Sequence, residues 1–253
     1  MLGPTQRFSD RVENYVRFRP GYPREIVTVL EQSAGLKKGS VIADIGSGTG
    51  KSCEPFLGAG YTVVGVEPND DMRRAAEQLF ADHANFRSVA GRAEMTTLPD
   101  ASVDWILSGQ AFHWFQAAQT RREFARILRC DGGIALVWNE RRDDGSMFER
   151  EYDSILKSRC PEYEQIRSLR EFDEQSLADF FAPRVVQSVV LDNHQSLDAE
   201  GLIGRVMSGS YAPASGPPHD ALVADLRGLF ARYQKSDRVV IHYETRLFFS
   251  QGV

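Results

Sequence analysis

Short apolar runs alternate with amphipathic segments over the first 140 residues of the chain. Five runs without strict polar alternation predict buried strands, at residues 40–45, 61–67, 85–91, 103–109 and 132–140. Helical periodicity between them predicts helices at residues 24–34, 51–57, 70–80 and 120–128. Strands that are apolar on both faces are typical of a parallel sheet covered by helices on both sides. The pattern therefore predicts an α/β fold with a doubly wound open sheet, which binds its ligands at the carboxyl ends of the strands.

The pattern changes after residue 140. Helical segments are expected within residues 147–180, and a strand is expected at residues 184–192. A segment rich in Gly, Ser and Pro, residues 208–218, separates two more helices. Residues 238–250 predict a long final strand. The second part of the chain is therefore expected to add helices and two strands to the first.

Composition favours a single domain over residues 1–253, with a core of residues 1–140 and with cap helices and the last two strands in residues 141–253. The chain has 253 residues, of which 42% are hydrophobic and 26% charged, so it can bury a sizeable core. Its formal net charge is −5 and no basic stretch alternates with aromatic residues, so we expect no nucleic-acid partner. No segment has the length and apolarity of a signal peptide or membrane span, and we expect no membrane association. The composition leaves monomer and homodimer open.

The three cysteines lie far apart in the sequence, at Cys53, Cys130 and Cys160. An odd number of dispersed cysteines predicts free thiols in a reduced, cytoplasmic protein. No pair of Cys or His residues has the spacing of zinc ligands, so no metal is expected.

The segment "DIGSGTGKS", which begins at Asp44, has three glycines at alternate positions after an apolar run. A phosphate-binding P-loop would require glycine at Ile45, and a dinucleotide motif would require glycine at Lys51. The pattern D-x-G-x-G-x-G remains. A tight turn without a ligand stays possible in principle, but one glycine would suffice for it, and three cost considerable chain entropy.

The segments that surround this loop resemble class I S-adenosylmethionine-dependent methyltransferases. "VIADIGSGTGKS" resembles the first motif of the family, "VVGVEPNDDM" the second, and "GRAEMTTLPDASVDWILSGQAFHWF" the third and fourth. The resemblance covers roughly residues 8–140. It is closest to the small-molecule branch that includes the trans-aconitate methyltransferases, in which a stretch like "RVENYVRFRPGYP" is frequent at the N-terminus. The resemblance implies a Rossmann-like seven-stranded sheet with an antiparallel last strand and a helical cap.

The resemblance also implies a set of residues that bind S-adenosylmethionine and its product S-adenosylhomocysteine. Glu67 follows Gly46 by 21 residues, where a carboxylate at the end of the second strand would accept hydrogen bonds from the ribose hydroxyls. Met72 would pack on the adenine or belong to the core of its helix. The full set expected to bind the cofactor is Tyr15, Arg19, Asp44, Gly46, Ser47, Gly48, Gly50, Glu67, Pro68, Met72, Ala93, Glu94, Gln110 and Ala111.

The methyl acceptor is expected beyond the ends of the fourth and fifth strands. Candidate contacts are His113, Trp114, Trp138, Asn139 and Tyr211. His113 could act as a general base, contact a ligand or serve the structure, and Trp138 could instead pack in the core. Arg19 and Arg141 are candidates to bind an acidic acceptor, because guanidinium matches a carboxylate with two hydrogen bonds.

The function that we expect is methyl transfer from S-adenosylmethionine to an oxygen, carboxylate or hydroxyl, of a small molecule. Two alternatives belong to other classes. A nicotinamide-dependent oxidoreductase is disfavoured by the absent G-x-G-x-x-G pattern. A non-catalytic S-adenosylmethionine-binding module would bind the cofactor without turning over any acceptor.

Overall fold

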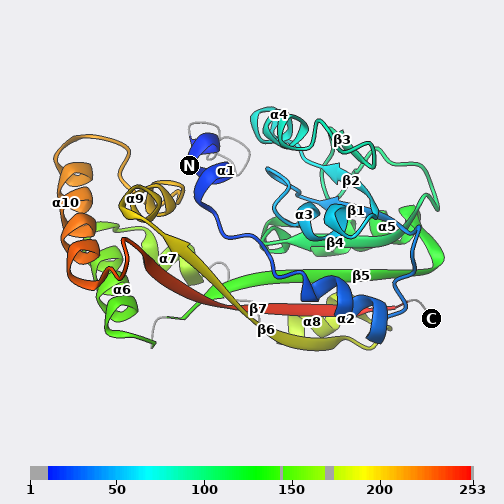
Figure 1. Cartoon of the computed structure of the whole chain (residues 1–253). Helices are drawn as coiled ribbons and strands as arrows, with labels where there is room; N and C mark the ends of the chain where they lie inside the picture. The colour runs from blue at the N-terminus through cyan, green and yellow to red at the C-terminus, as the bar shows by residue number, and fades with distance from the viewer. Residues whose placement is uncertain (1–10, 143–144, 169–173, 252–253) are drawn as a thin grey trace.

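The computed structural model describes residues 11–142, 145–168 and 174–251, and its centre is a seven-stranded sheet with the order β3-β2-β1-β4-β5-β7-β6. β1 to β5 run parallel, β7 is antiparallel to β5, and β6 is antiparallel to β7. This arrangement, visible in Figure 1, confirms the predicted fold class. The strands are β1 Val41–Ile45, β2 Thr62–Val66, β3 Phe86–Val89, β4 Val103–Gly109, β5 Leu128–Arg141, β6 Gln187–Leu197 and β7 Val239–Ser250.

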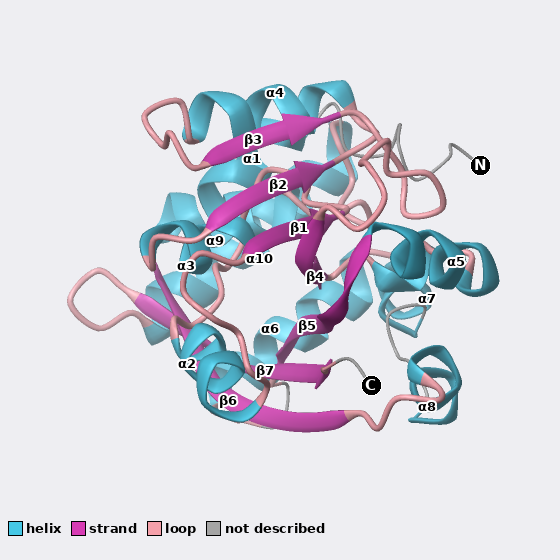
Figure 2. Cartoon of the chain, turned by 90° about the vertical axis from the view of Figure 1, so that its right-hand side faces the viewer, coloured by secondary structure: helices cyan, strands magenta, loops and turns pink. Residues whose placement is uncertain are grey.

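Helices cover both faces of the parallel strands (Figure 2). Side chains of β1 alternate between two core clusters, with Ile42 in one and Ala43 in the other. The first cluster includes residues of α2 and α3, and the second includes residues of α5 and α8. Burial on both faces explains why the strand sequences are apolar throughout. In the first half of the chain the helices are α1 Val12–Phe18, α2 Glu25–Ser33, α3 Cys53–Gly58, α4 Asp70–Leu79, the 3-10 turn η2 Phe112–Trp114 and α5 Ala117–Ile127.

The sheet has its switch point between β1 and β4. β1 pairs with β2 on one side and with β4 on the other, so the chain first runs outward to β3 and then returns to the opposite side of β1. Loops that leave neighbouring strands in opposite directions open a crevice at the carboxyl ends of these strands. The glycine loop and the segment after β4 both begin at this crevice.

A second group of helices packs around the far ends of β5, β6 and β7, at the left of Figure 1. These helices have their own apolar cluster, which includes Tyr152, Leu202, Leu226 and Ile241. We call the group, together with the segment between α9 and α10, the cap. The helices after β5 are α6 Met147–Arg159, α7 Tyr163–Ser168, α8 Glu174–Phe181, α9 Ala199–Met207 and α10 Gly216–Tyr233, of which α8 packs on the core sheet instead.

The main difference from the sequence prediction is the extent of β6. The strand begins at Gln187 and continues to Leu197, beyond the apolar run expected at residues 184–192. Its last residues are polar because β6 is an edge strand and much of it is exposed to solvent. Hydrogen bonding to β7, which continues to Val239, extends the strand where side-chain polarity predicts a loop.

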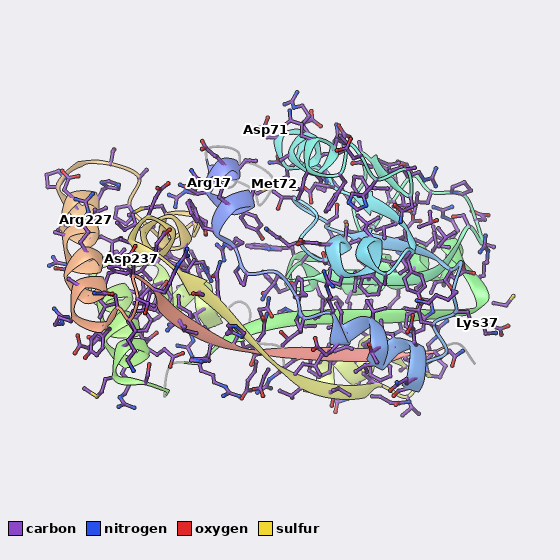
Figure 3. All side chains as sticks on the ribbon, viewed as in Figure 1. Arg17, Lys37, Asp71, Met72, Arg227 and Asp237 are labelled. Carbon is purple, nitrogen blue, oxygen red and sulfur yellow. The ribbon has the colours of Figure 1, made fainter. Side chains whose placement is uncertain are left out.

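The N-terminal helix α1 lies between the cap and the core. Its residues contact α9 on one side and α4 on the other, and Figure 3 shows Arg17 of α1 and Met72 of α4 on these neighbouring helices. Phe18 covers Gly204 of α9 so closely that a Cβ there would collide with its ring. An ion pair of 2.9 Å between Arg17 and Glu200 adds to this contact.

Arginines of the N-terminal segment also bind the backbone of the cap. The Arg11 guanidinium donates hydrogen bonds to the carbonyl oxygens of Met207, Gly209 and Ala212, and Arg19 donates to that of Ser208 at 3.0 Å. Each of these bonds is partly buried. Hydrogen bonds from these two arginine side chains to main-chain carbonyl oxygens therefore hold the segment between α9 and α10 in place.

Candidate active site

Three adjoining cavities lie between the core, α1 and the cap. The loop cavity, of about 330 Å³, is bordered by the glycine loop and the ends of β2 and β4. The large cavity, of about 420 Å³, lies at the end of β5 against α7 and α9. A connecting cavity of about 90 Å³ shares Gly46 and Gly48 with the first and Asn139 and Arg205 with the second. Gln110 lines all three.

Asp44 supports the glycine loop from below. Its carboxylate accepts hydrogen bonds from the Ser52 hydroxyl and, at 3.1 Å, from the Cys53 thiol. The side chain is completely buried, and this burial raises the pKa of Asp44 to about 6. Asp44 lines none of the three cavities, so the structure gives this predicted cofactor residue a supporting position.

The three loop glycines all have positive φ angles, which explains their residue type. They differ in what surrounds them. A Cβ on Gly46 would lie 2.7 Å from the Cβ of Ala111, and one on Gly50 would collide with the ring of Phe80. A Cβ on Gly48 would meet nothing within 4 Å. Gly50 is thus required by packing, whereas Gly48 keeps open the space that borders the loop cavity.

Glu67 follows β2 and brings a carboxylate to the loop cavity. The side chain is 8% exposed, and burial raises its pKa, although two backbone hydrogen bonds oppose the shift. The Gly48 N–H donates to Oε2 at 2.9 Å and the Asn69 N–H donates to Oε1 at 2.8 Å. The carboxylate is therefore fixed in orientation and retains lone pairs for a ligand with vicinal hydroxyls.

The remaining border of the loop cavity is mostly apolar. Met72, 4% exposed, comes from α4, whose N-cap Asn69 accepts from the Asp71 and Met72 amides. Glu94 accepts from the Gln116 N–H at 2.8 Å and so fixes the loop before α5. A flat, apolar ring system with polar edges fits such a border. Predicted cofactor residues found here are Tyr15, Gly46, Gly48, Glu67, Pro68, Met72, Ala93, Glu94, Gln110 and Ala111.

Gln110 occupies the junction of the cavities with an unusual backbone conformation. Its φ is 57°, a region that non-glycine residues seldom adopt and that costs about 1–3 kcal/mol. The Gln110 amide nitrogen donates to the Asn139 carbonyl at 2.8 Å, and its backbone N–H donates to Val137 at 3.0 Å. These bonds hold its side chain between β4 and β5, where both ligands of a two-substrate reaction would meet.

His113 and Trp114 lie in η2, directly after this junction. His113 lines the connecting cavity together with Arg19 and Ser47. Trp114, a predicted acceptor contact, instead borders the loop and connecting cavities and is 39% exposed. The short 3-10 turn accounts for this, because it directs Phe112 into the core and Trp114 outward.

Asn139 and Tyr211, which were predicted to contact the methyl acceptor, line the large cavity. The third, Trp138, also borders it, but the indole is 1% exposed and packs edge-to-face against Phe112 and Phe248. Its geometry favours the core-packing alternative. Arg19, proposed for an acidic acceptor, lines the connecting cavity but not the large one.

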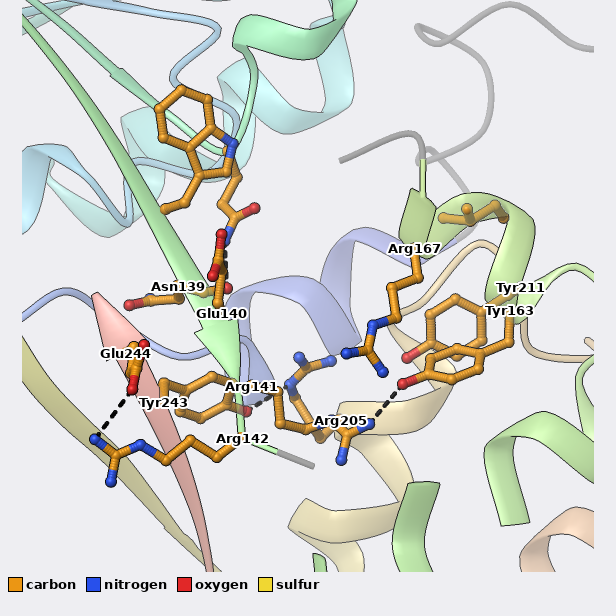
Figure 4. A pocket seen from close by; sticks show the side chains of 13 residues that line it. Asn139, Glu140, Arg141, Arg142, Tyr163, Arg167, Arg205, Tyr211, Tyr243 and Glu244 are labelled. Atoms are coloured by element: carbon orange, nitrogen blue, oxygen red, sulfur yellow. Dashed lines mark hydrogen bonds and ion pairs between the residues drawn. The ribbon is translucent and has the colours of Figure 1, made fainter. Parts of the chain in front are cut away.

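The sequence did not predict the residues of α7, α9 and β7 that line the large cavity. Figure 4 shows Arg205 of α9, Tyr243 of β7 and two residues of α7, Tyr163 and Arg167, around Arg141. The Arg205 Nε donates to the Tyr243 hydroxyl at 3.2 Å, and Arg141 donates to the Tyr163 hydroxyl at 2.5 Å. The only sequence signal is an arginine in an otherwise apolar stretch of α9, "GLIGRVM".

The comparisons with known proteins concern the sequence and the fold of this chain. Residues 43–136 match the family model described as "Methyltransferase domain". A methyltransferase of Mycobacterium tuberculosis, described as uncharacterized, is 37% identical over 153 residues, which cover 59% of this chain and 58% of the relative. The chain thus spans less than two thirds of the length of this curated relative. Residues 43–136 therefore have the sequence of a methyltransferase domain.

Solved structures extend the likeness of the methyltransferase domain to most of the chain. A protein described as a methyltransferase of an antibiotic biosynthesis pathway of Anabaena variabilis is 25% identical, covers 92% of this chain and 98% of its own, and superposes with a TM-score of 0.62. The geranyl diphosphate C-methyltransferase of Streptomyces coelicolor, crystallised with S-adenosylhomocysteine, covers 90% of this chain and 75% of its own at 10% identity and a TM-score of 0.50. At that identity the second likeness concerns the fold alone.

Two further findings concern the described part of the chain. Within it, no group of three or more His, Cys, Asp or Glu side chains has a metal-binding arrangement. None of the helices traced there combines the length and hydropathy that crossing a bilayer requires.

Proposed function

We propose that this chain transfers the methyl group of S-adenosylmethionine to an oxygen atom of a small molecule bound in the large cavity. The observation that carries the proposal is the junction at Gln110, which lines the loop cavity, the connecting cavity and the large cavity. A methyltransferase must bring cofactor and acceptor together at one point, and here two ligand-sized cavities adjoin at one residue. A cavity of about 420 Å³ suits a small acceptor.

The loop cavity fits the cofactor. Glu67 offers a fixed carboxylate for the ribose hydroxyls, and Gly48 leaves space for close approach to the backbone. Met72, Ala93 and Glu94 would surround the adenine. The methyltransferase domain match supports this assignment.

The residues of the chain would act chiefly by orientation. When bound, S-adenosylmethionine supplies an electrophilic methyl carbon and takes back the electron pair of the broken S–C bond as a neutral thioether. Gln110 and Asn139 would orient the acceptor oxygen toward this carbon. Tyr15 and Arg19, which line the connecting cavity from the N-terminal segment, would exclude water.

The role of His113 depends on whether the methylated group is a carboxylate or a hydroxyl. A carboxylate acceptor is already ionised near neutral pH and requires no base. A hydroxyl acceptor must lose its proton, and the imidazole in the connecting cavity could accept it. The polar border of the large cavity, with several guanidinium groups, favours the carboxylate.

Calorimetry with four ligands tests the cofactor assignment. S-adenosylmethionine and S-adenosylhomocysteine should bind more tightly than NAD or ATP, and the opposite order would refute the proposal. Release of S-adenosylhomocysteine is then measured with a panel of small acids and phenols. Cofactor binding without turnover of any acceptor would support the non-catalytic module instead.

A further inference from the structure

We infer that Asn193 and Gln195 of β6 are positioning residues for the methyl transfer. Their amide groups hold the main chain of the N-terminal segment, residues 11–22, and so place Tyr15 and Arg19 against the ligand cavities. Neither amide residue lines any of the three cavities. The inference rests on the function proposed above and names residues that act on the site from outside it.

The N-terminal segment has little apolar burial to hold it in place. No side chain of residues 11–22 is buried, and α1 has only seven residues. Isolated helices shorter than about 12 residues are marginal in water, and in proteins the burial of an apolar face stabilises most helices. In Figure 1 the blue chain leaves α1 between the cap and the core and continues to α2, whose Ile26, Val27 and Leu30 are buried. The position of the segment therefore depends on polar contacts along its length.

Gln195 binds the segment at the end of α1. Its Nε2 donates a partly buried hydrogen bond of 2.8 Å to the carbonyl oxygen of Phe18. A series of donors fixes the orientation of this amide. Arg205, which can only donate, binds the Tyr243 hydroxyl at 3.2 Å, and this hydroxyl donates to Oε1 of Gln195 at 3.3 Å. The Nε2 group is therefore directed toward the segment.

Asn193 binds the segment three residues further along. Its Nδ2 donates to the carbonyl oxygen of Gly21 at 2.9 Å and to Oδ1 of Asn139 at 3.1 Å. Asn139 itself donates to the Gly21 carbonyl at 3.0 Å, and the Thr245 hydroxyl donates to Oδ1 of Asn139 at 2.5 Å. Side chains of β5, β6 and β7 thus fix a single carbonyl group of the segment. The same Asn139 accepts at its own carbonyl from Gln110, at the junction of the cavities.

The side chains of the segment remain available to the ligands, because the sheet binds its main chain. Tyr15 lines the loop cavity and the connecting cavity, and Arg19 and Tyr22 line the connecting cavity. If the main chain were released, this wall would move away from the place where cofactor and acceptor meet. Exclusion of water and alignment of the two reactants both require the wall to stay in position.

The alternation of β6 offers a matched control. The side chains of Asn193 and Gln195 are half-buried, and His194 between them is exposed on the opposite face of the strand. Asn193→Leu and Gln195→Met remove the amide donors while they keep a similar side-chain size. His194→Leu makes the same kind of polar-to-apolar change on the exposed face and should have no effect on the segment.

Amide hydrogen exchange of the free protein tests the attachment without any ligand. Gln195→Met should speed exchange in residues 12–21 roughly three- to tenfold, as expected for the loss of one neutral hydrogen bond. Asn193→Leu should have a smaller effect, because Asn139 still donates to Gly21. Exchange in β1 and β4 should stay unchanged. Unchanged exchange in both variants, an equal increase in β1 and β4, or the same increase in His194→Leu would overturn the inference.

Calorimetry with S-adenosylhomocysteine tests the effect on the site. Because ordering the loosened segment then becomes part of the cost of binding, Gln195→Met should weaken the affinity by a similar factor of roughly three to ten. In Tyr15→Ala the same substitution should cost less, since the segment has lost its contact with the cofactor cavity. Faster exchange with unchanged affinity would assign the amides to structure alone. Fully additive effects of the two substitutions would show that Gln195 does not act through the segment.

The inference and the proposed function fail in different measurements. A wild type that does not bind S-adenosylmethionine would refute the function, while hydrogen exchange still decides whether the amides hold the segment. If acceptors are methylated, Gln195→Met should raise the KM for S-adenosylmethionine by the factor seen in calorimetry and change kcat less. Equal KM and kcat in wild type and Gln195→Met would preserve the function and refute the inference.

Discussion

The carboxylate of Glu67 accepts a hydrogen bond of 2.9 Å from the backbone N–H of Gly48, which joins the end of β2 to the glycine loop. A second bond, from the Asn69 N–H at 2.8 Å, fixes the other oxygen. The carboxylate therefore keeps one orientation without a ligand, and little side-chain entropy remains to be lost on binding.

Glu67→Ala should weaken S-adenosylmethionine binding by one to two decades. The substitution removes the ribose hydrogen bonds to a charged acceptor, with an expected net loss of roughly 1.5–3 kcal/mol in binding free energy. Glu67→Gln should lose less, because one acceptor oxygen remains. Calorimetry measures both, and circular dichroism checks that the fold is intact. Unchanged affinity in Glu67→Ala would show that the ribose is bound elsewhere.

Cofactor affinity should fall as the solution becomes acidic. Burial raises the pKa of Glu67, and the ribose hydroxyls donate to its ionised form, so binding is complete above that pKa and declines as the pH falls through it. Once Glu67 is protonated, the loss should level off near that of Glu67→Gln, because one acceptor oxygen remains. Titrations at successive pH values measure the slope. Glu67→Gln should flatten it, and an equal slope in that variant would assign the effect to another group.

The buried Asp44 should change the pH dependence of stability. Its folded pKa of about 6 lies above the ordinary value of 3.8, so the folded protein takes up a proton first as the pH falls. The cost of burying the charge is present at neutral pH and is relieved between about pH 6 and pH 4. Wild type should therefore gain up to about 3 kcal/mol in free energy of unfolding relative to Asp44→Asn over this range. Denaturant titrations at both ends detect the gain, and parallel curves would contradict it.

Gly48→Ala should chiefly lower cofactor affinity, whereas Gly50→Ala should chiefly lower thermal stability. Both positions have positive φ, so alanine introduces similar backbone strain. At Gly50 the new Cβ would also collide with Phe80, which predicts a clear loss of thermal stability. At Gly48 the Cβ would enter open space beside the loop cavity, which predicts a larger loss of cofactor affinity than of stability. Melting curves and calorimetry on the same samples distinguish the two. Identical profiles would mean that Gly48 has no particular relation to the ligand.

His113→Ala distinguishes the two acceptor chemistries. With a carboxylate acceptor, activity should decrease moderately and remain flat with pH above about pH 6. With a hydroxyl acceptor, wild-type activity should rise through the histidine pKa, and the substitution should abolish the rise. Rates for acids and phenols across this range decide between them. Turnover of phenols alone, with a histidine-dependent rise, would exclude the carboxylate.

Sequence motifs could predict the residues around the loop cavity, because these residues lie close together in the sequence. The glycine loop, Glu67 and Met72 belong to short segments in which strand, loop and helix follow each other, so their order in the sequence specifies their positions. Asp44 shows the limit, because its spacing does not reveal that its side chain turns to Ser52 and Cys53 beneath the loop. Gly50 likewise gives no sign in the sequence that Phe80 is its neighbour.

The other half of the site could not be predicted in this way. Arg205, Tyr163 and Tyr243 come from α9, α7 and β7, and only the packing of the cap on the extended strands brings them to Arg141. In the sequence, Arg205 stands out as an arginine in an otherwise apolar stretch, but that stretch does not show which residues Arg205 contacts. For Trp138, the sequence allows two positions. The end of a strand predicts contact with a ligand, but aromatic side chains from η2 and β7 bury the indole.

The hydrogen bonds from Arg11 and Arg19 to the segment between α9 and α10 go to carbonyl oxygens, which every residue type provides. Substitution of the side chains in that segment leaves these attachments unchanged. Tyr211, which borders the large cavity, can therefore be exchanged during evolution without loosening the contact between the N-terminal segment and the cap. The contact between the N-terminal segment and the cap can thus be inherited unchanged while the side chains that border the large cavity vary from one protein to another.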